Sequence, residues 1–192
     1  MAKLFSFRPS LTLKGRRFMG LRGFTGKPFH PPLTDVPIGA YVLAAAFDVV
    51  SSVFSGETWA RDLFRAGTYV MVGGAIVGVG AVVTGAMDWW KSTPKGTQVR
   101  RTVNAHAITM IIVQVAVAIT IQLRIASFDE PSTPLLIAAL TVLIAAVVAA
   151  GATIGGSLVF DYGFNVTTAA DSPVWHESDH DQLPGRKPPP PS

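Results

Sequence analysis

The sequence of 192 residues contains no cysteine. This absence excludes disulfide bonds, zinc sites built from thiolates, all-cysteine iron–sulfur clusters and cysteine nucleophiles. The usual motifs of soluble catalysis are also missing: there is no Gly-x-Ser-x-Gly, no His-Glu-x-x-His and no phosphate-binding glycine-rich loop. These absences favour a function other than catalysis, without excluding an enzyme.

Charged residues are scarce. They make up 15% of the chain, whereas a soluble domain usually carries about a quarter. Hydrophobic residues make up 49%, and the mean hydropathy is +0.40. This composition predicts an integral membrane protein. In a membrane protein, the net charge of +4 reflects which loops face the cytoplasm. Because no aromatic-basic RNA-binding motif accompanies this charge, we expect no nucleic-acid partner.

Four apolar runs, at 36–54, 66–87, 103–123 and 134–160, are each long enough to cross the hydrocarbon layer, which takes about 20 helical residues. They predict an all-α, integral membrane four-helix bundle over 30–166, between an arm at 1–29 and a polar, proline-rich tail at 167–192. No tandem repeat is apparent. The segment His30-Pro31-Pro32 precedes the first run, and we expect Thr34 or Asp35 to cap its helix.

The distribution of basic residues predicts the orientation. The arm carries seven basic residues and no acid, and the loop between the second and third runs carries four. The other two loops carry two and one. Because cytoplasmic loops are enriched in Lys and Arg, both termini are predicted to be cytoplasmic.

Both ends of the chain carry recognisable patterns. In the arm, four phenylalanines alternate with the basic residues, which suits either an anionic membrane surface or docking to a larger complex. In the tail, His176 and His180 are four residues apart and could bind a divalent metal, but an exposed acidic patch is the favoured interpretation, so we expect no metal. Two small-residue faces, Gly74 with Gly78 and Gly151 with Gly155, permit close helix packing.

The predicted topology brings polar residues together at the cytoplasmic side of the bundle. This layer consists of His30, Asp88, Arg100, Arg101, Asn104 and His106. We expect an ion pair between Asp88 and Arg101. Ionisable residues inside a membrane are costly to bury, so they are candidates for a functional role and are expected to have a partner of opposite charge. For Asp48, in the other half of the membrane, the expected partner is Arg61 or Arg65.

Three interpretations of His30 and His106 remain open. They can be structural, hydrogen-bonded to neighbouring carbonyls or carboxylates. They can be the two axial ligands of a b-type haem, a site that helical bundles build in their interior. They can also form part of a proton or quinone site.

A set of short motifs resembles a bacterial family of predicted four-helix membrane proteins that is known as a domain of unknown function. The motifs, in order, are His30-Pro31, Pro37-Ile38-Gly39, Asp48, Gly85-Ala86-Met87-Asp88, Arg101 with His106, and the segment 155–166. The resemblance covers residues from about 28 to 166. It implies that His30, Asp88, Arg101 and His106 belong to a shared site, and that the protein lies in the inner membrane of a bacterium.

Some relatives resemble membrane anchors fused to a Rieske-type iron–sulfur domain, and the segment 175–185 is similar to the opening of such a domain. Without cysteine we expect no cluster here. The leading functional prediction is a non-catalytic transmembrane subunit or accessory protein of a respiratory or photosynthetic complex, with partners bound through 1–29, 161–192 and the glycine faces. The alternatives are a b-haem electron-transfer protein using His30 and His106, or a small transporter or quinone-binding protein using Asp48 and Asp88.

Overall fold

The computed structural model describes residues 6 and 8–167. This part of the chain is helical, without a named strand, which confirms the all-α prediction. A short helix and a 3₁₀ turn come first, and four long helices follow. Their bounds are α1 (Arg8–Leu11), η1 (Gly20–Arg22), α2 (His30–Val53), α3 (Ala60–Ser92), α4 (Gln98–Ala126) and α5 (Leu135–Phe160).

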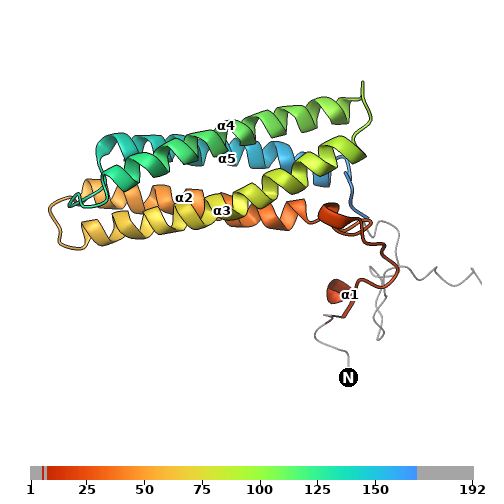
Figure 1. The fold of residues 1–192 in the computed structure, drawn as a ribbon, viewed down its shortest axis with the longest axis horizontal. Helices are drawn as coiled ribbons and strands as arrows, with labels where there is room; N and C mark the ends of the chain where they lie inside the picture. Colours follow the sequence, from red (N-terminus) through yellow and green to blue (C-terminus); the bar gives the residue numbers. More distant parts are fainter. Residues whose placement is uncertain (1–5, 7, 168–192) are drawn as a thin grey trace, which may run out of the picture.

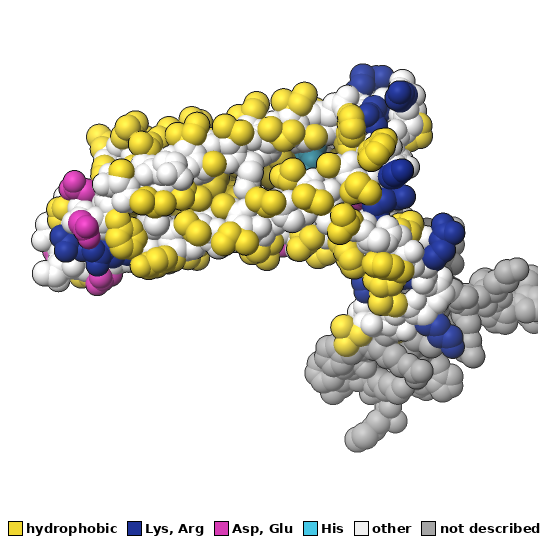
Figure 2. Space-filling model, in the orientation of Figure 1, with side chains coloured by type: hydrophobic (Ala, Val, Ile, Leu, Met, Phe, Trp, Pro, Cys, Tyr) yellow, Lys and Arg dark blue, Asp and Glu magenta, His cyan; other side chains and the backbone are white. Residues whose placement is uncertain are grey.

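The four long helices run up and down beside one another and form a closed ring of contacts (Figure 1). Helices α2 and α4 run in one direction, whereas α3 and α5 return in the other. Each is long and apolar enough to cross a membrane. Only 22–33% of each apolar window is buried inside the bundle, so most of its apolar surface faces outward. That surface forms a hydrophobic belt along the bundle (Figure 2), as expected for contact with lipid.

Helices α2, α3 and α4 are longer than their apolar runs, and α2 begins at His30 rather than near residue 36. The prediction that Thr34 or Asp35 caps this helix was wrong. Phe29 precedes it without a side-chain cap, and prolines occupy its first turn, where their missing N–H groups need no acceptor. Thr34 instead lies inside the helix, and its hydroxyl donates to the carbonyl of Pro31 at 2.6 Å.

The two glycine faces pack against helices of the same chain, which corrects the prediction that they receive partner subunits. Gly74, Gly78 and Gly151 are buried, and Gly155 is half-buried. An added Cβ at any of them would lie within 3 Å of a side chain across the interface. These side chains are Ala40 at Gly74, Gln114 at Gly78, Met110 at Gly151 and His106 at Gly155. The missing side chains therefore let the bundle's own helices approach closely.

A buried ion pair locks the end of the bundle where α2 meets α3. Asp48 of α2 accepts from the guanidinium of Arg124 of α4, and both side chains are completely buried. The Thr133 hydroxyl donates to the same carboxylate at 3.2 Å, and Arg124 donates to the Thr68 hydroxyl at 2.9 Å. Neither predicted partner reaches Asp48: Arg61 donates to the backbone carbonyl of Glu130, and Arg65 pairs with Asp129. The pair thus connects the two halves of the bundle.

We predict that Arg124→Met destabilises the protein by about 3–5 kcal/mol, because it leaves the Asp48 carboxylate buried without its counter-charge. The double variant Asp48→Leu/Arg124→Met removes both charges and should recover most of that loss. Unfolding in mixed micelles, followed by circular dichroism, measures both effects. Equal losses in the single and double variants would show that the pairing itself is unimportant.

Candidate functional site

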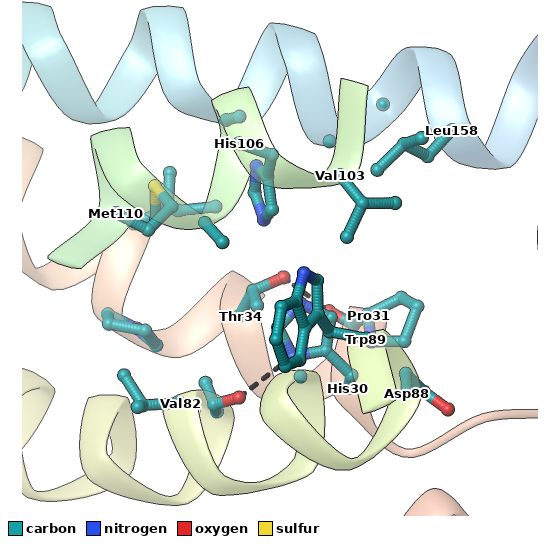
Figure 3. Close-up of a pocket in the computed structure, with 18 of the residues that line it drawn as sticks. His30, Pro31, Thr34, Val82, Asp88, Trp89, Val103, His106, Met110 and Leu158 are labelled. Carbon is teal, nitrogen blue, oxygen red and sulfur yellow. Dashed lines mark hydrogen bonds between the residues drawn. The ribbon is translucent and has the colours of Figure 1, made fainter. Parts of the chain in front are cut away.

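The opposite end of the bundle contains a cavity of about 830 Å³. It lies between the hairpin of α2 and α3 and the hairpin of α4 and α5, and most of its lining is apolar (Figure 3). Cavities that bind cofactors or other small molecules commonly have about 300–1,000 Å³. Two imidazoles, those of His30 and His106, face each other across it.

His30 crosses from the first turn of α2 to α3. Its Nδ1 atom lies 2.9 Å from the backbone carbonyl oxygen of Ala81. Its ring lies against Gly85, where an added Cβ would come within 2.7 Å of Cε1. Only glycine at position 85 therefore leaves room for the imidazole in this orientation.

His106 crosses from α4 to α5 in the same manner. Its Nδ1 atom lies 2.9 Å from the backbone carbonyl oxygen of Gly151. Its ring lies against Gly155, where an added Cβ would come within 2.8 Å of Cε1. We call each of these arrangements, a ring bonded to a helix carbonyl and packed against a glycine, an imidazole seat. The two seats lie in equivalent positions on opposite walls of the cavity.

The hydrogen bonds determine the protonation of each neutral ring. A carbonyl oxygen only accepts, so each Nδ1 carries the proton and each Nε2 carries a lone pair. The ring centroids are 6.1 Å apart, and the ring planes are nearly perpendicular, at 79°. Within residues 6 and 8–167, no group of three or more His, Asp or Glu side chains could hold a bare metal ion. The pair therefore suits a group that brings further ligands of its own.

The matching seats reveal an internal repeat that is not apparent in the sequence. His30 and His106 are 76 positions apart, and so are Asp48 and Arg124. The carbonyl acceptors, Ala81 and Gly151, are 70 positions apart, as are the two glycine seats. The two hairpins are thus related by an approximate two-fold axis parallel to the helices. Sequence comparison misses the repeat because it survives at few positions.

Asp88 holds the polar mouth of the cavity together, at the C-terminal end of α3. Its carboxylate accepts from Arg22 Nε at 3.4 Å and from Asn165 Nδ2 at 3.0 Å. The predicted partner, Arg101, is exposed. Asn165 has a φ of +58°, a left-handed conformation that Asn adopts more readily than most residues. Asp88 therefore ties the arm and the segment after α5 to the bundle.

An aromatic contact lies beside this mouth. The Trp89 indole lines the cavity, and its Nε1 donates to Asn104 Oδ1 at 2.7 Å. The guanidinium of Arg100 stacks over the same indole, 3.8 Å from the ring centroid. The residues of the predicted polar layer lie at this end of the bundle, divided between the imidazole pair, the Asp88 contacts and this aromatic contact, apart from the exposed Arg101.

Several residues of the site escaped prediction from the sequence. Gly85 and Gly155 were seen only as part of a motif or packing face, although each seats an imidazole. Arg22 and Arg124 were counted only as topological charges. Asn165 was noted within the 155–166 motif without a role. The repeat would have signalled Arg124, because it occupies the position in α4 that Asp48 occupies in α2.

A family profile described as "Predicted membrane protein (DUF2231)" matches residues 26–168. The chain belongs to the DUF2231 family. The matched region contains both imidazole seats, Asp88, Asn165 and the buried ion pair. No curated protein and no solved structure matches the chain. The tail pattern of His176 and His180 and the segment 175–185 lie outside the described residues.

We predict that Gly85→Ala and Gly80→Ala change stability in opposite directions. Gly80 faces open space, so alanine there should stabilise α3 by up to about 1 kcal/mol through helix propensity. Alanine at Gly85 would collide with His30 and should cost about 1–3 kcal/mol through overpacking. Unfolding in mixed micelles measures both; equal changes would mean that Gly85 is not a seat for the imidazole.

Proposed function

We propose that this DUF2231 protein is a membrane electron-transfer protein that holds one b-type haem between His30 and His106. The observation that carries this proposal is the pair of facing imidazoles. Ring nitrogens bind a metal at about 2 Å, so a single ion held between two imidazoles places the ring centroids roughly 6 Å apart. The observed separation is 6.1 Å. Haem would supply one-electron redox chemistry, the usual use of bis-histidine ligation in a membrane bundle.

The surroundings of the imidazoles support axial ligation. Metal-ligating histidines almost always donate their second ring N–H to a carbonyl, a carboxylate or water, which fixes the tautomer and raises the basicity of the ligating nitrogen. His30 and His106 both do this, through Ala81 and Gly151. Because the two acceptors are backbone carbonyls inside helices, the rings are held by rigid elements rather than by loops.

The repeat and the lining support a planar occupant. A macrocycle presents two equivalent faces, and the approximate two-fold axis presents two equivalent imidazoles to them. The macrocycle brings four equatorial ligands, which matches a site with only two protein ligands among the described residues. The lining is largely apolar, and Arg100, stacked on the cavity-lining indole of Trp89, lies at the polar mouth, where its charge suits the acidic edge of such a group.

The other interpretations receive less support from the structure. The subunit hypothesis drew on glycine faces that are used within the bundle, and on an arm that is folded against α3 through Arg22. The transport hypothesis drew on Asp48 and Asp88. Asp48 is sealed in an ion pair and does not line the cavity, and Asp88 lines the cavity but is held by Arg22 and Asn165. We retain the predicted bacterial inner membrane and cytoplasmic termini as part of the proposal, with the cavity at the cytoplasmic side.

The test is a reduced-minus-oxidised visible spectrum of the protein purified in mild detergent from cells supplied with haem precursor. We expect the sharp bands of a six-coordinate haem. His30→Ala and His106→Ala should each abolish them, whereas His176→Ala, outside the matched region, should leave them unchanged. Size-exclusion profiles control for folding. A featureless spectrum, or bands that persist in both cavity variants, would overturn the proposal.

A further inference from the structure

The cavity has a side opening between α3 and α4. These two helices contact each other more sparsely than the other neighbouring pairs of long helices. Two side-chain bridges join them here, from Trp89 to Asn104 and from Gln114 to the carbonyl of Ala75 at 3.2 Å. Among the described residues, no hydrogen bond joins α3 to α4 between these bridges. Ten helical residues, from 104 to 114, correspond to about 15 Å. We call this gap the α3–α4 window.

The side chains at the window face both inward and outward. Val82, Ile108 and Ile111 line the cavity, yet 41%, 59% and 53% of their surfaces are exposed on the outside of the bundle. A residue that lines a cavity and is also exposed marks the place where the cavity opens. Because this stretch lies within two membrane-spanning helices, the opening faces hydrocarbon rather than water. A molecule that enters by this route must therefore be soluble in lipid.

The cytoplasmic edge of the window offers a polar contact and an aromatic surface. Asn104 uses Oδ1 to accept from Trp89, and no hydrogen bond within the described chain uses its Nδ2. This amide lies six residues into α4, about 9 Å along the helix axis. A free amide donor beside an indole suits a flat ring that carries a carbonyl oxygen. Combined with the requirement for lipid solubility, these features select a membrane quinone.

We infer that the ring of a lipid-soluble quinone docks in the α3–α4 window, beside the imidazole pair, with a carbonyl oxygen on Asn104 Nδ2. This inference rests on the proposed function, because it makes the quinone pool the electron partner of the haem. With haem bound, oxidation of one quinol to quinone would release two protons to water and two electrons, one to each of two ferric haem proteins. In this proposal the two imidazoles hold the haem, and the window gives the quinone access to it.

The first experiment compares reduction of the haem by a short-chain quinol and by dithionite. Ile108→Trp fills the window and should lower the ratio of the quinol rate to the dithionite rate at least ten-fold, because dithionite is water-soluble and does not need the window. Ile119→Trp is the matched control, because Ile119 is equally exposed on α4 but does not line the cavity. Equal quinol rates in the two variants and the unaltered protein would overturn the inference.

The second experiment measures binding without activity. A photoreactive azido-quinone, added to the protein in liposomes, should label peptides that contain residues 82–89 and 104–111. Asn104→Leu should reduce this labelling, and Ile119→Trp should not. Labelling elsewhere, or labelling that is unaffected by Asn104→Leu, would overturn the quinone site while the haem spectrum still stands. Absence of the haem spectrum would instead overturn the proposed function.

Discussion

The ion pair of Asp48 and Arg124 determines how the two halves of the bundle meet. Both charges are removed from water, so each depends on the other and on the hydroxyls of Thr68 and Thr133. The pair lies across the approximate two-fold axis. Two copies of the first hairpin would place two carboxylates together, and two copies of the second would place two guanidinium groups together. Opposite charges at equivalent positions therefore favour the pairing of unlike hairpins.

This pairing also sets the register of the imidazoles. His30 and Asp48 are 18 residues apart on α2, and His106 and Arg124 are 18 residues apart on α4, which is about 27 Å along each helix. When the charges meet at one end, equal spacing on two parallel helices brings the rings to the same level at the other. A slip of one turn would separate the rings by about 5.4 Å along the axis. The structural lock and the candidate site are thus coupled through two rigid helices.

The sequence was sufficient to predict what depends on composition and length. The four spans, the helical fold and the common level of His30 and His106 follow from apolar run lengths and alternating direction. It was insufficient wherever a contact between side chains depends on the rotation of a helix about its own axis. Asp48 could have met Arg61 or Arg65 by depth alone, and only the packed bundle shows that it faces α4. The start of α2 was missed because apolar content, not the two prolines, was used to place it.

The seats of the histidines show the same limit on a smaller scale. A single sequence does not show which glycine on one helix contacts a histidine on the next. In the structure, the rings lie against Gly85 and Gly155. What the structure adds is a partner for one nitrogen of each ring: Nδ1 donates to a helix carbonyl, and no hydrogen bond among the described residues uses Nε2.

The two ends of the bundle differ in how they balance packing against function. At the Asp48 end, the helices are drawn together by opposite charges and by hydroxyls that bond them, with Nε of Arg124 left as the one buried nitrogen of the pair without a partner among the described residues. At the other end, the helices enclose about 830 Å³ of largely apolar space, which forgoes the dispersion contacts that a filled core would provide. A ligand that binds only the folded state stabilises it by mass action, so an occupant held by His30 and His106 would restore the contacts that the cavity lacks. The folded state therefore depends on the ion pair at one end, and the proposed haem would supply, at the other, the packing that the cavity lacks.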